Sequence, residues 1–284
     1  MTLSLVGMSM MGSFALADVI VDAEQVVTEE TNIAMATTKV EDIYAGNSSA
    51  ENATQKLTQS INLGYANTAG ALDSTIFTGK YIAGFTTQGY QAKELRVGLD
   101  FSAFYNKVED AAKTEQYMAN LGLEQNIVNG WFGYAVLNWY RNEALGYKNK
   151  VTVGAGIGKM LFADSVHSLK VKLGVAYNVA DFAGLSAQEA LEANDSYATL
   201  VQYIEYNRAL SKSNNFYVKI GASESFDNFD DIEGIGVFGL NFAVAESVSV
   251  SLEEEIQYNG LSAFSNALDS KFNTKTVVRI GYNF

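Results

Sequence analysis

The stretch that decides the fold reads Leu169-Lys170-Val171-Lys172-Leu173-Gly174-Val175-Ala176-Tyr177-Asn178-Val179. Apolar side chains occupy every second position, and charged, polar or small side chains fill the positions between them. Successive side chains of a β-strand point to opposite faces of the sheet, so this period of two predicts a strand with one apolar face. A helix would instead repeat its apolar positions at intervals of three and four residues.

The same alternation continues toward both ends of the chain. Glu254 is the exception in the stretch 247–258, whose other apolar-face positions hold Val248, Val250, Leu252, Ile256 and Tyr258. Applied to the whole chain, the pattern predicts twelve strands, near residues 57–66, 75–85, 94–104, 116–127, 131–141, 149–161, 168–180, 197–209, 215–224, 234–243, 247–258 and 274–284.

The connections between these strands alternate in length. Residues 129–130, 211–214 and 243–246 form tight turns, whereas the long polar connections are 106–115, 181–196, 225–233 and 259–273. A bacterial outer-membrane barrel with both termini in the periplasm has short turns on that side and long loops outside. The sequence therefore predicts an all-β fold, a single transmembrane antiparallel β-barrel of about 12 strands over residues 57–284, with both termini periplasmic.

Composition and the N-terminal region limit the other possibilities. The chain has no cysteine and no proline, which excludes disulfides and thiol chemistry and suits paired strands. Its net charge of -13 argues against nucleic acid as a partner. Residues 1–17 contain an apolar run that ends in Ala15-Leu16-Ala17, which predicts a signal peptide, and the acidic residues 18–56 predict a periplasmic extension. No basic segment precedes the run, so an upstream start or another role for the run stays open.

Charged residues recur on the polar face of the predicted strands. They are Arg96, Asp100, Glu124, Lys170, Lys172, Glu253, Glu255, Lys275 and Arg279. A basic side chain at the lipid midplane costs about 2 to 4 kcal/mol, so we expect these residues to face the lumen. Mixed signs either cross-link the interior shut or line a narrow polar pore, and twelve strands lie between the filled and the open size classes of barrel.

The last predicted strand places Val278, Ile280, Tyr282 and Phe284 on one face. It resembles the C-terminal signature of bacterial outer-membrane barrels, which implies that the barrel-assembly machinery reads these four residues. The alternative is an ordinary last strand of a soluble barrel. Aromatic residues near the strand ends fit the interfacial girdles of a membrane barrel, namely Tyr65, Phe85, Phe104, Tyr105, Trp131, Trp139, Tyr140, Tyr177, Tyr258 and Phe284.

Two stretches together resemble the salt-induced outer-membrane protein family, the YdiY-like proteins otherwise known only as a domain of unknown function. In Asn62–Thr75, Gly70 and Asp73 match the family's Gly-Asn-Thr-Asp-Thr run and Ser74 is close to it. Trp131–Gly158 follows the family's order of an aromatic strand, a loop and a glycine-rich strand. Over residues 58–284 the resemblance implies a fold and an outer-membrane location. It implies no catalytic residue, and the family name records a condition of expression.

No motif predicts enzymatic chemistry. His167 is the sole histidine, and a histidine-activated nucleophile would need a serine motif and an orienting partner near it. The glycines of 154–158 would cradle a phosphate only at the start of a helix, so we expect them to save space in the lumen. The acidic loops 181–195 and 224–233 are either cation sites or, as we favour, solvated loops. We therefore predict no catalytic residue, metal or cofactor.

The sequence favours an outer-membrane protein of structural or stress-related role with a largely closed interior. The alternative is a passive, porin-like channel for small solutes. A secretion barrel is disfavoured because only about forty residues separate the predicted cleavage site from the barrel. Expected partners are outer-membrane lipid, lipopolysaccharide and the assembly machinery, and the sequence leaves the oligomeric state open.

Overall fold

The computed structural model describes residues 56–68, 74–108, 113–183, 196–261 and 271–283. The predicted signal peptide, nearly all of the predicted extension, Gly70, Asp73 and Phe284 lie outside these residues. Within the described part of the chain, no helix is long and apolar enough to cross a membrane.

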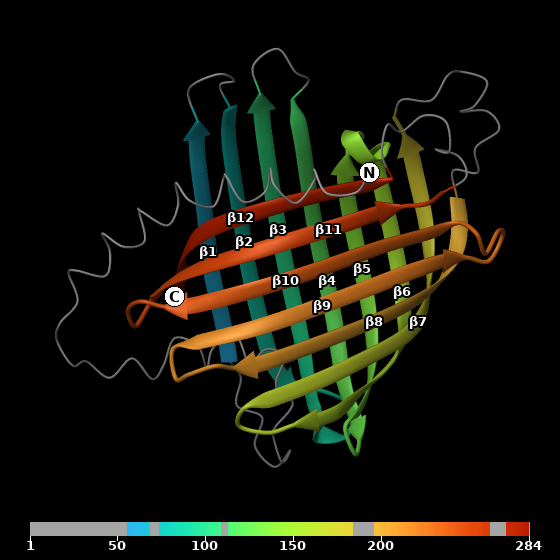
Figure 1. Ribbon diagram of the computed structural model, residues 1–284. Coiled ribbons are helices and arrows are strands. Elements are labelled where there is room, and N and C mark those ends of the chain that lie inside the picture. The colour runs from blue at the N-terminus through green and yellow to red at the C-terminus, as the bar shows by residue number, and fades with distance from the viewer. Residues whose placement is uncertain (1–55, 69–73, 109–112, 184–195, 262–270, 284) are drawn as a thin grey trace, which may run out of the picture. The chain divides into compact units, whose positions relative to one another are not determined.

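The described residues form a closed antiparallel barrel of twelve strands (Figure 1). The strands are β1 (Lys56–Thr68), β2 (Ser74–Gln88), β3 (Glu94–Val108), β4 (Thr114–Val128), β5 (Trp131–Asn142), β6 (Tyr147–Ala163), β7 (His167–Phe182), β8 (Ser196–Ala209), β9 (Asn214–Ser225), β10 (Ile232–Ala243), β11 (Val248–Asn259) and β12 (Phe272–Asn283). Two short 3₁₀ turns, η1 (Tyr90–Ala92) and η2 (Glu143–Leu145), interrupt the connections. Each strand pairs with its neighbours in the chain and β12 returns to β1, which confirms the predicted fold class and strand number.

Antiparallel order divides the connections between two ends of the barrel. The short-turn end, where β1 begins and β12 ends, holds the connections 89–93, 129–130, 164–166, 210–213 and 244–247. The long-loop end holds 69–73, 109–113, 143–146, 183–195, 226–231 and 260–271. The connection predicted over 106–115 is wrong in length, because the alternation of β3 continues to Val108 and β4 already begins at Thr114. The lengths of the connections therefore alternate most strongly between β7 and β12.

The tightest turn shows how the sequence fixes the register of a hairpin. Asn129 and Gly130 join β4 to β5 with φ angles of 49° and 78°. Positive φ at both central residues is the conformation that an Asn-Gly pair adopts in two-residue hairpins. A Cβ atom on Gly130 would also lie 2.9 Å from the carbonyl oxygen of Met160, so the neighbouring hairpin leaves room for glycine alone.

The two faces of the wall differ in chemistry. Large apolar side chains stand exposed on the outer face of every strand, for example Leu63, Phe77, Leu99, Leu121, Leu137, Val153, Val175, Ile204, Ile220, Phe238, Leu252 and Ile280. Polar and charged side chains are buried on the inner face, for example Arg96, Asn142, Lys170, Thr199, Glu205, Glu253 and Arg279. The barrel is thus apolar outside and polar inside.

Candidate functional site

The barrel interior is the candidate site, because the charged side chains of the strands converge there. All nine predicted lumen residues lie on the inner face and take part in ion pairs with one another or with further inner-face residues. They form one network near the short-turn end and a second group in the middle of the lumen.

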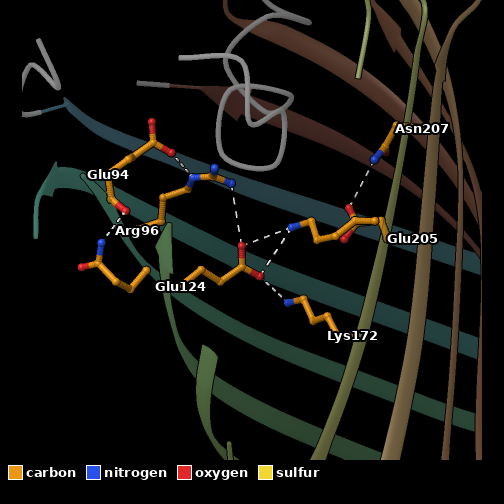
Figure 2. A network of polar contacts seen from close by, with 8 residues as sticks. Glu94, Arg96, Glu124, Lys172, Glu205 and Asn207 are labelled. Atoms are coloured by element: carbon orange, nitrogen blue, oxygen red, sulfur yellow. Dashed lines mark hydrogen bonds and ion pairs between the residues drawn. The ribbon is translucent and has the colours of Figure 1, made fainter. Parts of the chain in front are cut away.

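The Glu124 network lies near the short-turn end and consists of Glu94, Arg96, Glu124, Lys170, Lys172, Glu205 and Asn207. Figure 2 labels all of these residues except Lys170. The carboxylate of Glu124 on β4 accepts hydrogen bonds from Lys170 (3.2 Å) and Lys172 on β7. Arg96 on β3 pairs with Glu94 and lies 3.7 Å from the same Glu124 carboxylate. Three acids and three bases meet in the network, so its formal charge is zero.

The lysines reach Glu124 by crossing the inner face of β5 and β6. Glycines clear this path, because a Cβ atom on Gly158 would lie 2.2 Å from the ring of Phe132. On Gly156 it would lie 2.9 Å from the ring of Tyr134. The rings then carry the ammonium groups: Lys170 lies 5.6 Å from the centre of the Phe132 ring and Lys172 lies 5.3 Å from that of Tyr134. The glycines predicted to save space in the lumen thus leave room for the rings of Phe132 and Tyr134.

The middle of the lumen holds a second set of ion pairs. Arg279 lies 2.7 Å from Glu253, Lys275 lies 2.9 Å from Glu255, and Lys80 lies 3.5 Å from Asp100. These pairs join β12 to β11 and β2 to β3, which are neighbours in the wall. Each predicted charge therefore finds an opposite charge within reach, and the acids and bases neutralise one another.

A cross-wall bridge joins opposite sides of the barrel and consists of Gln116, Tyr140, Asn142, Gln257 and Lys275. The side-chain oxygen of Gln257 on β11 accepts hydrogen bonds from Tyr140 and Asn142 on β5, both at 3.2 Å. Lys275 on β12 donates to Gln116 on β4 at 2.9 Å. In barrel order β5 lies opposite β11, so these bonds span the lumen from wall to wall.

The Leu145 cluster lies at the long-loop end and consists of the buried residues Leu145, Tyr147, Ala180, Tyr197 and Leu261. The connection between β5 and β6 turns into the barrel there, with Gly146 at a φ of 83°. Asn259 on the opposite wall donates to the carbonyl oxygen of Leu145 at 2.8 Å. The connection is thus bonded to β11 on the other side of the barrel and does not project as a loop.

Glu233 was expected in an acidic loop, but it begins the inner face of β10. Its carboxylate accepts hydrogen bonds from Tyr147 (2.6 Å), Lys150 (2.5 Å) and Tyr197 (3.3 Å). Sequence reasoning missed Glu233, Lys150 and Lys80 as interior residues. The alternation within the predicted strands 75–85 and 149–161 carries a signal for the two lysines, whereas Glu233 lies before the predicted strand 234–243. Among the described residues, no group of three or more His, Cys, Asp or Glu is arranged to hold a metal ion.

Two predictions for the girdle residues are wrong. Phe104 lies inside the barrel, where its ring centre is 5.4 Å from the Nζ of Lys275, and Tyr140 belongs to the cross-wall bridge. Both residues occupy even positions in strands whose even positions face inward. The girdle prediction rests on nearness to a strand end, whereas the face of each side chain is set by the alternation within its strand, which places Phe104 on the same inner face of β3 as Arg96.

The sole histidine belongs to the wall near the short-turn end. His167 begins β7, and its Nδ1 lies 2.7 Å from the hydroxyl of Tyr206. In the preceding turn the Asp164 carboxylate accepts the backbone N–H groups of Val166 and His167, both at 2.7 Å. These two hydrogen bonds lower the pKa of Asp164.

The predicted assembly signal lies on β12. Val278, Ile280 and Tyr282 face outward, and Ile280 and Tyr282 are 63% and 51% exposed, while Phe284 lies outside the described residues. The outward face is the one that another protein or lipid would meet during insertion.

Comparison with known proteins adds a family and general likenesses of fold. No curated protein matches the chain. The translocator domain of the autotransporter NalP from Neisseria meningitidis is 11% identical, with 96% of this chain and 97% of that chain covered and a TM-score of 0.43. The NanC porin is 9% identical, with 80% of this chain and 98% of that chain covered and a TM-score of 0.44. The β domain of the Bordetella autotransporter BrkA is 10% identical, with 81% of this chain and 98% of that chain covered and a TM-score of 0.40.

The family match covers the barrel. Residues 61–284 match the family described as "Protein of unknown function, DUF481". This confirms the expected kinship with a domain of unknown function, whereas the salt-induced part of the family name stays a prediction. The chain therefore belongs to the DUF481 family of proteins of unknown function.

Proposed function

We propose that the protein is an outer-membrane β-barrel of structural or stress-related role whose interior is largely closed. The observation that carries the proposal is the cross-wall bridge, in which Gln257 bonds to Tyr140 and Lys275 bonds to Gln116 across the lumen. Groups that bond directly at 2.9 to 3.2 Å leave no room between them for a hydrated ion.

The outer face supports the membrane location. Twelve-residue strands such as β11 are about 40 Å long and, at the usual barrel tilt of about 40°, reach about 30 Å along the barrel axis. That height matches the hydrocarbon layer of a bilayer. The exposed apolar side chains of the outer face would be buried in lipid, which compensates for their exposure.

The ends of the barrel support an orientation. The start of β1, the end of β12 and the shorter connections share one end, and this is the arrangement of barrels whose termini are periplasmic. We therefore place the short-turn end in the periplasm and the long-loop end outside. Residues 1–17 would then be the signal peptide and 18–56 the periplasmic extension. The partners would be lipid, lipopolysaccharide and the assembly machinery reading β12, and no enzymatic activity is proposed.

Planar-bilayer recording of the refolded protein tests the closed interior. We expect the wild-type protein to give no discrete open steps. The variant Gln257→Ala removes the centre of the cross-wall bridge and should give brief steps. Gln202→Ala is the matched control, because Gln202 lies on the outer face of β8, bonded to Glu224. Steady open steps in the wild-type protein would defeat the closed interior and favour the porin-like alternative.

A further inference from the structure

The outer rim of the short-turn end is both apolar and basic. Four of its five connections carry or adjoin an exposed aliphatic side chain, namely Val128, Val166, Leu210 and Val244. Among the described side chains of these connections and of the adjoining outer face, the bases Lys93, Lys159, Arg208 and Lys212 outnumber the acids Asp164 and Glu246. Apolar side chains interleaved with basic ones are typical of a surface that meets an anionic membrane interface.

The long-loop end differs from this rim in its charge. Three of its basic residues pair with acids: Lys113 with Glu115 at 2.9 Å, Arg141 with Glu143 at 2.6 Å and Lys148 with Asp181 at 3.7 Å. The connection 226–231 adds Asp227, Asp230 and Asp231. In the described part of the chain, basic side chains are thus in surplus at the short-turn end and acidic side chains at the long-loop end.

A cluster on the basic rim, the His167 seat, consists of His167, Tyr206 and Arg208. His167 on β7 lies directly opposite Arg208 on β8, and both side chains face outward. Side chains opposite each other on one face of an antiparallel pair have Cβ atoms about 5 Å apart. The hydroxyl of Tyr206 lies 2.7 Å from Nδ1 of His167, and the two rings stack with their centres 6.0 Å apart. Three polar groups therefore meet at one place on the outer face.

The His167 seat presents hydrogen-bond donors and positive charge together. A neutral imidazole has one N–H and a phenol has one O–H. The bond between His167 and Tyr206 uses one of these two hydrogens, so either tautomer leaves the other hydrogen outside that bond. The exposed guanidinium of Arg208 adds a planar fork of N–H donors, which matches the oxygens of a phosphate. In the adjoining turn, the Asp164 carboxylate is engaged by two backbone N–H groups.

The surroundings of the seat are polar on one side and apolar on the other. At the same end of the barrel, Trp131 begins β5, and the Nζ of Lys159 lies 4.9 Å from its ring centre. Tryptophan and tyrosine mark the level of the lipid headgroups on a membrane barrel. Toward the long-loop end, the outer face of β7 and β8 exposes Leu173, Val175 and Ile204. A ligand at the seat therefore has its polar part at the rim and an apolar surface beside it.

We propose that the His167 seat binds the phosphate of an acidic phospholipid in the periplasmic leaflet, with the acyl chains along the outer face of β7 and β8. The inference rests on the proposed outer-membrane location and orientation. The phosphate fits the donors of the seat, the net negative headgroup fits the basic rim, and the acyl chains fit the exposed apolar side chains. A soluble phosphate ester would meet the same donors but gain nothing from the apolar face.

Lipid binding to the refolded full-length protein in a nonionic detergent tests the seat. Phosphatidylglycerol and phosphatidylcholine are titrated in parallel, and bound lipid is counted by native mass spectrometry. We expect phosphatidylglycerol to bind more tightly. Arg208→Gln should weaken its binding about fivefold, the factor expected for one basic side chain at an anionic surface. Arg141→Gln is the matched control and should leave binding unchanged, because Arg141 lies on the outer face at the other end and pairs with Glu143.

Three results would overturn the proposal. Equal binding of the two lipids by the wild-type protein would remove the preference, and equal losses in Arg208→Gln and Arg141→Gln would assign it to charge in general. Displacement of phosphatidylglycerol by glycerol phosphate would make a soluble phosphate ester the occupant.

Two further measurements keep the test decisive. If Arg208→Gln does not refold, Arg208→Lys and His167→Phe replace it; each should weaken phosphatidylglycerol binding by a smaller factor, and no loss in either would also overturn the proposal. Flotation of the wild-type protein with neutral phosphatidylcholine vesicles is scored separately. A failure of the proposed membrane location is thereby distinguished from membrane insertion without a lipid preference.

Discussion

The two ends of the lumen hold side chains of different chemistry. Near the short-turn end, the Glu124 network brings together six charged side chains that neutralise one another. At the long-loop end, the Leu145 cluster packs apolar and aromatic side chains beside one carboxylate, Glu233. A charge network fails when one member is removed, because its partners stay buried and unpaired. An apolar cluster fails when volume is removed. The two ends should therefore respond to different substitutions.

The largest effect is expected at the charged end. Glu124→Ala leaves Arg96, Lys170 and Lys172 without their shared carboxylate in a buried setting. Breaking a buried pair costs about 3 to 5 kcal/mol, so we expect a loss of that order in the free energy of unfolding, measured by urea titration in vesicles. Glu224→Ala, on the outer face, should change it by less than about 0.5 kcal/mol. Equal effects of the two substitutions would show that the network does not stabilise the barrel.

The next effect is expected at the apolar end. Leu145→Ala removes volume from the Leu145 cluster, where Leu145 is 4% exposed. Truncation of a buried leucine costs about 2 to 5 kcal/mol, and we expect the lower part of that range because the lumen beside it is polar. Leu210→Ala, in an exposed turn, is the control. The loss should be the same at low and high salt, and a strong salt dependence would contradict an apolar closure.

Between the two ends, substitution of the acidic residues of β11 tests whether Glu253 and Glu255 face the lumen. Glu253→Ala plus Glu255→Ala leaves Arg279 and Lys275 as unpaired cations in the lumen. Any current through this variant should prefer anions relative to a current through Gln257→Ala, as reversal potentials in a salt gradient would show. Unchanged selectivity would count against both acids lining the lumen.

The smallest effect is expected in the turn before β7. Backbone hydrogen bonds from Val166 and His167 lower the pKa of Asp164 below its ordinary value of 3.8. A lowered folded-state pKa adds stability above the unfolded-state value, and this stability is lost as the pH falls through the folded-state value. Asp164→Ala should therefore be slightly less stable than the wild-type protein at pH 7, and the difference should shrink below about pH 3.8. A difference that is constant with pH would assign the effect to something other than the carboxylate.

Sequence predicts the local part of this structure well. The alternation in 169–179 is enough to place Lys170 and Lys172 on the inner face of β7, because the period of a strand is fixed by its geometry. It does not indicate that both reach Glu124, since β5 and β6 lie between them and the contact depends on the glycines of the intervening wall. Pairing partners are a property of the folded lumen.

The errors have the same origin. Glu233 was grouped with the acidic residues before it, and its interior position follows only from the start of β10 and from Lys150 on another strand. Tyr140 fits an outer girdle in isolation, yet the register of β5 turns it toward Gln257. The short pairing of β1 with β12, through four residues of each strand, depends on how the two strands meet and does not follow from either strand alone.

The paired glycines of β6 and β7 let the two strands approach closely, because a Cβ atom on Gly156 would lie 2.6 Å from the Cα of Gly174. A circular barrel of twelve strands would have a backbone diameter of about 24 Å, which is about twice the combined reach of a tyrosine and a glutamine. Tyr140 and Gln257 nevertheless bond, so the wall must fold more sharply somewhere. Gly156 lies opposite Gly174, and neither has a side chain to resist a crease there. Strand number alone would predict a wide tube, whereas the bond between Tyr140 and Gln257 requires opposite walls to lie closer together than a circular tube allows.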